Sequence, residues 1–336
     1  MYSDWKTTAC PHDCPCGCTI RARSEGDRIE MRPHRGNRWT DRLCPKGLRY
    51  AARVFAPGRL RTPLLRSGSG WLEISWDKAW SIWAERITEA LAESGPLSLM
   101  YCASAGSMYF SKSLIPNIFS ELGGYTATKG TLCSSIGSSG LKEATLGWGV
   151  PYITPELQLK ARGIFLWGRN SLVTQPRMKK VFDSIRENGG EIASLEIRNS
   201  ETHENCDRSW NIAPGGDFAL AAWLCKKLIA SGNSSEGWKS RVVNYEEFLD
   251  QLTNLEENKL LETAGMDEAA AEDILAWLMK FRPVTQMPSY GAQRYLHGDM
   301  QFKWIFALSV LFGGFEDPCA GLSFSKNEHA LFPGEL

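Results

Sequence analysis

Residues 163–198 read "GIFLWGRNSLVTQPRMKKVFDSIRENGGEIASLEIR". The stretch begins with a short apolar run that ends in a glycine-containing turn, continues as a helical stretch and closes with a second apolar run. Residues 95–106, "GPLSLMYCASAG", repeat the first part of this scheme. Apolar runs that alternate with helical stretches are typical of a mostly parallel sheet with helices on both faces. The sequence therefore predicts a doubly wound α/β fold.

Signals for further helices and strands lie on both sides of this stretch. Residues 70–95 predict a strand followed by a helix, with Ser75 as N-cap and Asp77 in the first turn. Residues 214–281 predict mainly helices, and residues 284–314 predict a strand, a turn and an apolar helix. The apolar residues that recur at helical spacing in the first of these helices are Trp76, Ala79, Trp80, Trp83, Ile87 and Leu91.

Length and composition exclude several classes of protein. The chain has 336 residues and 43% hydrophobic content, enough for one large domain or two smaller ones with a buried core. Lysine plus arginine equals aspartate plus glutamate at 38 each, so the net charge gives no basis for a nucleic-acid or anionic-membrane partner. No run approaches about 18 consecutive apolar residues, and the N-terminus lacks the pattern of a secretory signal. We therefore expect a cytoplasmic protein with no membrane segment.

Cysteines are concentrated near the N-terminus, in "TTACPHDCPCGC". Three residues separate Cys10 from Cys14 and Cys14 from Cys18, and Cys44 follows later in "RLCPKG". Three close thiolates and one remote thiolate suit a 4Fe–4S cluster, whose irons each need one soft ligand. The alternative is a structural zinc site, which usually takes its thiolates as two CxxC pairs. The three-plus-one grouping favours the iron–sulfur cluster.

Cys16 is a fifth thiol within the same run. Its spacing leaves open that it replaces Cys14 or Cys18 as a ligand. Because thiols with one residue between them rarely reach two corners of a tetrahedron, we expect Cys16 to be a non-ligand. The surrounding segment also contains "CTIRARSEGDRIEMRP", which alternates like the strands of a hairpin. We therefore predict a small β-rich module, held by its cluster, over residues 1–70.

Three segments together resemble the N-terminal part of a known enzyme family. They are "TACPHDCPCGC", "CPKG" and "RLRTPLLRSGSGWLEISWDKAW". The family is the molybdopterin oxidoreductases of the dimethyl sulfoxide reductase superfamily, which carry molybdenum or tungsten on two pterin guanine dinucleotides. Its members usually have aspartate at the position of Cys16. The resemblance therefore implies that the 4Fe–4S ligands are Cys10, Cys14, Cys18 and Cys44.

The resemblance also implies two catalytic residues. Cys133 lies in "GTLCSSIGSSGLKEATLG", which resembles the family loop that supplies a thiolate to molybdenum or tungsten, a soft ligand for a soft metal. Without the resemblance, a lone cysteine among Ser and Gly is more often a small buried hydrophobic residue. Ser134 stays open as the metal ligand, since some members use serine. Lys46 of "CPKG" is implied to lie between the cluster and the pterin and to assist electron transfer; the alternative is a solvated surface lysine.

Residues from about 155 to 280 resemble the dinucleotide-binding half of the family. Gly168 ends a strand and, with Asn170, is expected to let the backbone approach a phosphate, although a glycine by itself marks only a turn. The next strand ends at Glu196 and Arg198, where the family usually has Asp-Pro-Arg. Glu196 is implied to accept hydrogen bonds from a ribose or a guanine.

Two later segments complete the implied cofactor site. "APGGD" matches a family loop whose acidic residue binds guanine, which implies Asp217 as the acceptor, with backbone access at Gly215 and Gly216. A helix N-cap is the alternative role for this aspartate. "GAQRY" and "GGFEDPCAG" resemble segments near the pterin, with Gln293 and Arg294 as polar contacts.

The resemblance implies a division of the chain and a partner. Residues 1–70 form the iron–sulfur module, residues 71–336 form the α/β molybdopterin-binding body, and the C-terminal β-barrel domain usual in the family is absent. A separate chain is expected to supply that domain, as in formylmethanofuran dehydrogenases. The predicted function is two-electron substrate chemistry at a Cys-ligated molybdenum or tungsten bis-pterin cofactor. Electrons are expected to pass through the 4Fe–4S cluster to an iron–sulfur or flavin protein.

Other functions stay open. A truncated relative could act as a non-catalytic iron–sulfur relay or scaffold, and tungsten could support non-redox hydration. A formate or formylmethanofuran dehydrogenase-like subunit, with its last domain on another chain, is a further alternative. Formate dehydrogenases have histidine directly after the metal-binding Cys or selenocysteine, whereas this chain has Ser134 and Ser135. This difference argues against formate as the substrate and favours sulfur oxyanions, oxides or organic molecules.

Overall fold

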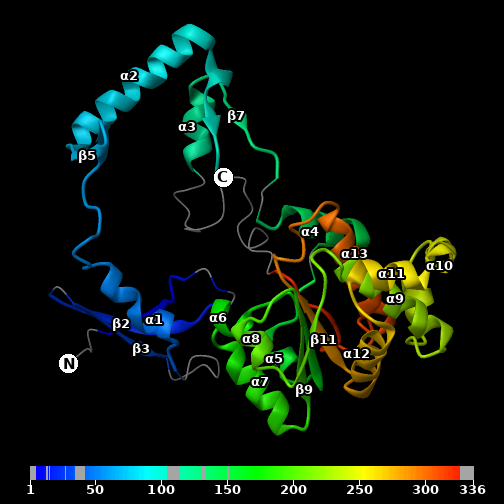
Figure 1. The fold of residues 1–336 in the computed structure, drawn as a ribbon. Helices are drawn as coiled ribbons and strands as arrows, with labels where there is room; N and C mark the ends of the chain where they lie inside the picture. The colour runs from blue at the N-terminus through cyan, green and yellow to red at the C-terminus, as the bar shows by residue number, and fades with distance from the viewer. Residues whose placement is uncertain are drawn as a thin grey trace. The chain divides into compact units, whose positions relative to one another are not determined.

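The computed structural model describes residues 5–12, 14, 16–26, 28–34, 42–103, 114–130, 133–149 and 151–325 (Figure 1). The chain divides into two compact units, Met1–Lys129 and Gly130–Leu336. The predicted boundary at residue 70, between a cluster module and a cofactor-binding body, stays a prediction.

The N-terminal part of the first unit is a small antiparallel sheet. Its strands β1 (Lys6–Ala9), β2 (Thr19–Glu25) and β3 (Arg28–Pro33) lie in the order β1-β2-β3. The predicted hairpin is confirmed, since β2 and β3 pair antiparallel over their length. Helix α1 (Pro45–Tyr50) begins directly after Cys44, and a short 3-10 turn (Ala51–Arg53) follows it.

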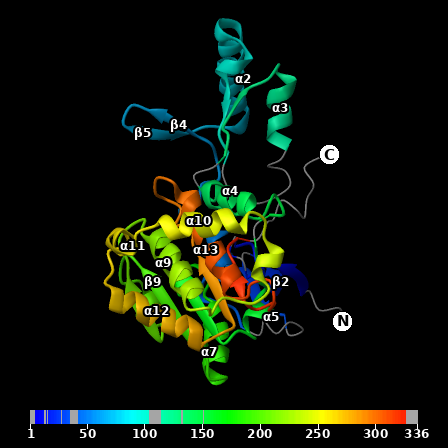
Figure 2. The ribbon, with the colours of Figure 1, turned by 90° about the vertical axis from the view of Figure 1, so that its right-hand side faces the viewer.

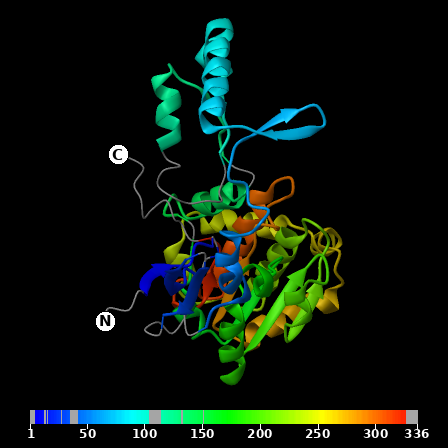
Figure 3. The same cartoon turned by 90° about the vertical axis from the view of Figure 1, so that its left-hand side faces the viewer.

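The rest of the first unit contains a second hairpin and a long helix. Strands β4 (Leu64–Ser67) and β5 (Gly70–Glu73) pair antiparallel and lead into α2 (Trp76–Ser94), as Figures 2 and 3 show. The predicted cap is confirmed, because the Ser75 hydroxyl accepts a hydrogen bond from the Lys78 N–H at 3.2 Å. After α2 come a 3-10 turn (Pro96–Ser98), β6 (Met100–Tyr101), α3 (Ile115–Glu121) and β7 (Thr126–Ala127), with β6 and β7 parallel.

The predicted apolar stripe of α2 forms but is open to solvent. Trp76, Trp80 and Trp83 are 58%, 56% and 51% exposed, and consecutive rings along the stripe lie 6.2 and 5.7 Å apart. All residues of α2 are described, and none of them is buried. Spacing therefore predicted the helix and its stripe correctly, but not what packs on the stripe.

The second unit is built on a five-stranded sheet. Its strands are β8 (Gly163–Trp167), β9 (Glu191–Glu196), β10 (Arg208–Asn211), β11 (Val284–Pro288) and β12 (Gly321–Leu322). They lie in the order β10-β9-β8-β11-β12, and every neighbouring pair is parallel. The predicted α/β architecture with a parallel sheet is therefore confirmed in this unit.

Helices cover both faces of this sheet (Figure 1). Along β8, Phe165 and Trp167 belong to the main apolar core, whereas Ile164 and Leu166 point to the opposite face because strand side chains alternate. The helices are α4 (Ser135–Ala144), α5 (Pro155–Gln158), α6 (Ser171–Thr174), α7 (Met178–Glu187), α8 (Glu201–Glu204), α9 (Asp217–Ala230), α10 (Tyr245–Asn254), α11 (Glu257–Ala264), α12 (Glu268–Lys280) and α13 (Gly298–Leu311), with a 3-10 turn at Trp238–Arg241.

The helices differ in what they bury. Helix α7 turns Val181, Phe182 and Ile185 inward, and α9 is buried over most of its length, with Trp223 fully inaccessible.

Among the described helices, none combines the length and the apolar character required to cross a bilayer.

Candidate functional site

A small cavity lies near the carboxyl ends of four strands, β8, β9, β10 and β11. The chain leaves β8 for β9 on one side and later returns to β11 on the other side of β8. In open parallel sheets, ligands bind in the crevice at such a switch in strand order. The cavity has a volume of about 60 Å³ and is called the cradle below. Its lining consists of Gly168, Leu195, Glu196, Ile197, Ile212, Asp217, Gly291, Ala292 and Tyr295.

The backbone after β8 approaches the backbone after β11 closely. Gly168 has φ +58°, a left-handed conformation that glycine adopts without steric cost. Its N–H donates to the Leu195 carbonyl at 2.8 Å, which holds the turn against β9. A Cβ placed on Gly291 would lie 3.6 Å from the Gly168 carbonyl oxygen. Because Gly168 and Gly291 have no side chains, the backbone groups at the carboxyl ends of β8 and β11 are not covered by side chains of these two residues.

Two buried carboxyl groups face the cradle. Glu196 and Asp217 are 7% and 4% exposed. Burial raises the pKa of Asp217 to about 7, and the nearby Glu196 charge adds to this rise. Burial likewise raises the pKa of Glu196, against the opposing effects of the Ile197 N–H and the Arg198 charge. Such carboxyl groups favour a ligand that brings N–H donors to them.

The predicted dinucleotide residues fall into two groups. Gly168, Glu196 and Asp217 line the cradle. Asp217 is the first residue of α9, whose N-cap is Gly216, so the alternative N-cap role for this aspartate is wrong by one residue. The predicted residues that do not line the cradle are Asn170, Arg198, Gly215, Gln293 and Arg294.

The predicted site residues that do not line the cradle are hydrogen-bonded elsewhere, exposed to solvent or packed against Tyr295. The Asn170 Oδ1 accepts hydrogen bonds from the Thr202 hydroxyl at 2.7 Å and from the Thr202 N–H at 3.3 Å. Arg198 and Arg294 are exposed. A Cβ placed on Gly215 would lie 3.2 Å from the ring of Tyr295. Sequence reasoning missed Tyr295 as a lining residue, although it is the last residue of the quoted "GAQRY" segment.

We expect Asp217 to make the stability of the cofactor-free chain fall as the pH rises. An aspartate in the unfolded chain titrates near its ordinary pKa of about 4, whereas Asp217 in the folded chain titrates at about 7. The folded state therefore binds the proton more tightly. The resulting stability is complete below about pH 4 and is lost as the pH rises through about 7. The change is on the order of 4 kcal/mol at most.

Urea unfolding at about pH 4 and about pH 8 measures this change. Asp217→Asn should reduce the pH dependence of the free energy of unfolding, while Glu196, whose pKa is shifted in the same direction, retains part of it. Asp183→Asn is the control, because the Asp183 side chain is exposed and pairs with Lys179 at 2.8 Å. An unchanged pH dependence in Asp217→Asn would contradict the assignment.

Cys133 and Gln293 meet at the start of α4. Cys133 precedes the N-cap Ser134 and is partly exposed. The Gln293 Nε2 donates to the Cys133 carbonyl at 2.5 Å, and the Gln293 Oε1 accepts from the Gly137 N–H at 2.6 Å. The structure thus joins two predicted site residues that are 160 positions apart in the sequence.

The four predicted cluster cysteines gather within the first unit. The Cys10 N–H donates to the Cys18 carbonyl at 2.7 Å and closes the loop between them. The Cys44 Sγ accepts a hydrogen bond from the Gly47 N–H at 3.4 Å. Burial raises the pKa of Cys10, and the charges of the other three thiols raise it further, so all four lie within electrostatic reach of one another.

His12 joins the first cysteine loop to the segment that carries Cys44. Its Nε2 lies 3.2 Å from the Lys46 carbonyl oxygen, and its ring packs edge-on against Tyr50 at 4.9 Å. The Lys46 side chain is exposed, yet its charge contributes to lowering the pKa of Cys14. Lys46 thus lies near the cysteine group, while its predicted position between the cluster and the pterin and its role in electron transfer stay predictions.

Cys16 lies between two of the predicted ligands. Its hydrogen bond to Cys14 is the largest cause that lowers the pKa of Cys14 to about 6. The pKa of Cys16 itself is raised, first by its hydrogen bond to Cys14 and then by its hydrogen bond to Cys18. Cys16 is thus placed as a hydrogen-bonding neighbour of both sulfurs.

The cysteines of the described residues form no disulfide and no group that could hold a single metal ion. All ten cysteines are described, and none of them forms a disulfide. Within the described ranges, no three His, Cys, Asp or Glu side chains lie close enough to hold one metal ion. A cubane places its thiolates on four different irons and so spreads them more widely than one zinc ion does. Both an iron–sulfur cluster and a zinc ion accept four thiolates, so the choice of the cluster over zinc stays a prediction.

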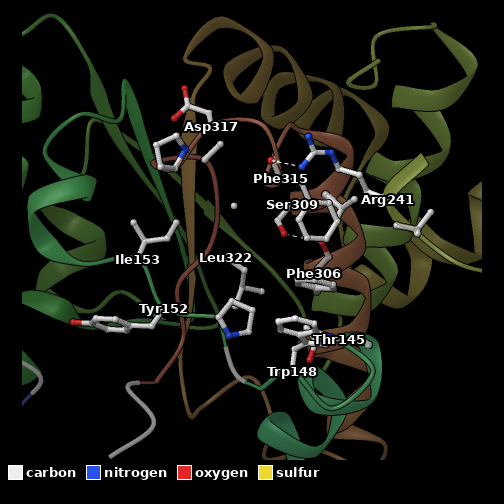
Figure 4. Close-up of a pocket in the computed structure, with 18 of the residues that line it drawn as sticks. Thr145, Trp148, Tyr152, Ile153, Arg241, Phe306, Ser309, Phe315, Asp317 and Leu322 are labelled. Atoms are coloured by element: carbon white, nitrogen blue, oxygen red, sulfur yellow. Dashed lines mark hydrogen bonds between the residues drawn. The ribbon is translucent and has the colours of Figure 1, made fainter. Parts of the chain in front are cut away.

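A second cavity, of about 620 Å³, lies between the C-terminal end of α4, α13 and the residues near β12 (Figure 4). Its lining is mainly apolar, with Tyr152, Phe306 and Leu322 among the residues labelled in the figure. The Arg241 guanidinium at one edge donates to the Phe315 carbonyl at 3.0 Å. None of the individually predicted site residues lines this cavity, although the predicted segment "GGFEDPCAG" contributes several lining residues, among them Phe315 and Asp317.

The family of the chain is shown by comparisons with known proteins. A family model described as Molybdopterin oxidoreductase matches residues 59–325. "Probable oxidoreductase YyaE" of Bacillus subtilis (strain 168) is 25% identical over 326 residues, which cover 95% of this chain and 48% of that protein. The "Assimilatory nitrate reductase catalytic subunit" of the same strain is 25% identical over 288 residues, covering 83% of this chain and 40% of that protein.

The same fold is found in a solved structure. Acetylene hydratase from Pelobacter acetylenicus matches with a TM-score of 0.71 at 18% identity, covering 94% of this chain and 44% of that one. At this identity the likeness shows the fold alone. The chain spans about half the length of the curated relatives it matches.

Proposed function

Because the chain belongs to the molybdopterin oxidoreductase family, we propose that it binds a molybdenum or tungsten bis-pterin guanine dinucleotide cofactor and acts in a two-electron oxidoreductase. The observation that supports this most is the cradle, which brings the predicted residues Gly168, Glu196 and Asp217 together at the switch in strand order.

The cradle residues have the chemistry that a guanine base requires. Guanine presents adjacent N–H donors on one edge, and ionised carboxylates are acceptors with several lone pairs. A cavity of about 60 Å³ has room for a few water-sized groups and so takes the polar edge of a base rather than a whole nucleotide. In this proposal Asp217 and Glu196 accept the guanine N–H groups, and the glycine backbone at Gly168 lies along a phosphate.

Cys133 is the proposed protein ligand of the metal. When bound, the metal and its pterins supply the two-electron chemistry, as cofactors generally supply the demanding step. The chain contributes a soft thiolate, delivered from the start of α4, and a backbone fixed by Gln293. Ser134 is the alternative ligand. The absence of histidine at position 134 leads this proposal toward oxides, sulfur oxyanions or organic substrates rather than formate.

The cysteine group in the first unit is the proposed route for electrons. Cys10, Cys14, Cys18 and Cys44 would hold a 4Fe–4S cluster, with Lys46 between cluster and pterin. The mutual electrostatic reach of the four thiols and the N–H···S bond at Cys44 support this assignment. An iron–sulfur or flavin protein would receive the electrons. A cytoplasmic location is part of the proposal.

A separate chain is proposed to supply the β-barrel domain that covers the second pterin. This part of the proposal rests on the resemblance to the family alone.

Metal analysis across size-exclusion fractions tests this function. We expect molybdenum or tungsten to elute with about four irons per metal atom, in a fraction larger than the 37.5 kDa of this chain. The reason is the proposed partner chain, which would elute together with this one. Inductively coupled plasma mass spectrometry of each fraction, together with gel analysis, gives both the metal ratio and the co-eluting chain.

Other results would contradict parts of the proposal. Iron without molybdenum or tungsten would support a relay subunit in place of an enzyme. A fully metallated, active monomer would exclude the separate chain. Turnover without any electron acceptor would point to hydration chemistry.

A further inference from the structure

The side chain of Gln293 bridges two backbone groups at the start of α4. Its Nε2 donates to the Cys133 carbonyl at 2.5 Å, and its Oε1 accepts from the Gly137 N–H at 2.6 Å. Gln293 is only 2% exposed. These two hydrogen bonds fix the orientation of the amide. In the flipped orientation, the NH₂ group would face the Gly137 N–H and the amide oxygen would face the Cys133 carbonyl, and both hydrogen bonds would be lost.

The Gln293 side chain supplies a hydrogen-bond acceptor that the N-terminus of α4 lacks. The first N–H groups of a helix have no intrahelical acceptor, and a side chain at the N-cap usually provides one. In α4 the N-cap is Ser134, whose side chain does not cap the helix. Gly137 is the third helical residue, and its N–H finds its acceptor on Gln293 instead. Gln293 therefore caps α4 from a segment remote in sequence.

Gly137 makes this approach possible. A Cβ at this position would lie 2.8 Å from the Gln293 Oε1 and 2.9 Å from the Phe302 ring. Both distances are shorter than carbon contacts allow, so any side chain there would displace the amide. Lys303 of α13 also pairs with Glu143 of α4 at 2.7 Å, which holds the two helices together further along.

The loop that carries Gln293 also lines the cradle. It connects β11 to α13 and contributes Gly291, Ala292 and Tyr295 to the lining. Within the loop, the Arg294 N–H donates to the Gly291 carbonyl at 3.1 Å. One ordered loop thus touches both the cradle and the backbone of Cys133.

We propose that Gln293 is a positioning residue that sets the backbone of Cys133, and with it the direction of the thiol, relative to the cradle. This goes beyond the polar pterin contact expected from the sequence, and it rests on the proposed role of Cys133 as the metal ligand. The amide touches no reacting atom. It acts through the Cys133 carbonyl and the first turn of α4.

The chain offers a matched control in Gln301. This residue of α13 is also 2% exposed, and its amide also bridges a carbonyl and an N–H at a helix start. Its Nε2 donates to the Gly215 carbonyl at 2.8 Å, and its Oε1 accepts from the Phe218 N–H at 2.6 Å. Gln301→Met therefore removes an equivalent bridge while leaving the backbone of Cys133 untouched.

The first test uses the full chain without cofactor. Gln293→Met keeps the side-chain length and removes both hydrogen bonds. Alkylation of Cys133 by iodoacetamide, followed by peptide mass spectrometry, should be about tenfold faster in this variant, the change expected for loss of the bridge. In Gln301→Met the rate should stay within about twofold of the unmodified chain.

Rescue by a conservative variant separates the bridge from general packing. Gln293→Glu keeps an oxygen that accepts from the Gly137 N–H in either protonation state. Hydrogen exchange at the Gly137 amide should therefore remain slow in Gln293→Glu and become about tenfold faster in Gln293→Met. Equal exchange rates in the two variants would overturn the capping role.

The second test uses the metallated protein. X-ray absorption at the molybdenum or tungsten edge, at matched metal content, should show one sulfur ligand fewer in Cys133→Ala and a shift toward that spectrum in Gln293→Met. If Cys133→Ala leaves the spectrum unchanged, the proposed metal ligand is wrong. If Cys133→Ala changes the spectrum while Gln293→Met changes neither spectrum nor alkylation, the positioning role is wrong and the proposed function stands.

Discussion

Cys133→Ala should lower substrate turnover by about a thousandfold, which corresponds to a loss of about 4 kcal/mol of transition-state stabilisation. The methyl group of alanine has no lone pair to give to the metal, whereas a thiolate is the soft ligand that the metal prefers. The fold should survive, because Gln293 binds the Cys133 carbonyl rather than its side chain. Turnover with a reduced dye and a panel of oxyanions and oxides, at matched metal content, measures the effect.

Two further variants make this result specific. Cys102→Ala is the control, because Cys102 is exposed and lies outside the candidate sites. Cys133→Ser should recover part of the turnover, since an alkoxide can occupy the same position. Full activity in Cys133→Ala, combined with loss of activity in Ser134→Ala, would transfer the ligand role to Ser134.

Cys14→Ala should reduce iron in the purified protein from about four atoms per chain to less than about one. Removing one of four thiolates leaves an iron without a protein ligand, and the exposed cluster is then lost. Cys16→Ala should keep the iron, because Cys16 is a hydrogen-bonding neighbour of Cys14 and Cys18 rather than a proposed ligand. Iron and acid-labile sulfide assays, with the visible absorption of the cluster, measure both variants.

The reverse pattern would overturn this ligand set. Protein that keeps its cluster in Cys14→Ala and loses it in Cys16→Ala would show that Cys16 is the second ligand. Equal iron in both variants, with zinc present, would instead support the structural zinc site. The pair is well matched because the two thiols are close in sequence and both partly buried.

The sequence predicted β8, β9 and β11 of the second unit well because these apolar runs are short, almost entirely buried and bounded by turn residues, whereas the largely exposed β10 was not predicted. All five residues of β8 are buried, as expected for a central parallel strand. The order of the strands was not predictable, because it depends on pairing between β8 and β11, which are far apart in the chain. Local pattern carries no information about such pairing.

The same distinction holds for the candidate site. Gly168, Glu196 and Asp217 were predicted from local motifs, and the structure brings them to one cavity. The bond from Gln293 to Cys133 could not be predicted, because nothing in either motif specifies a partner 160 positions away. Asn170 shows the opposite case, since the predicted phosphate contact has its Oδ1 hydrogen-bonded to Thr202.

The strand order of the second unit also determines when the cradle can form during synthesis. Strand β8 ends at residue 167 and its neighbour β11 begins at residue 284, so more than a hundred residues must be made between them. At about 5–20 residues per second, this interval lasts roughly 6 to 24 seconds. During that time one edge of the most central strand has no partner, and an apolar edge of this kind is prone to incorrect pairing. Loading of the proposed dinucleotide is therefore expected to be a late event, which must wait until the ribosome has released the chain beyond Tyr295.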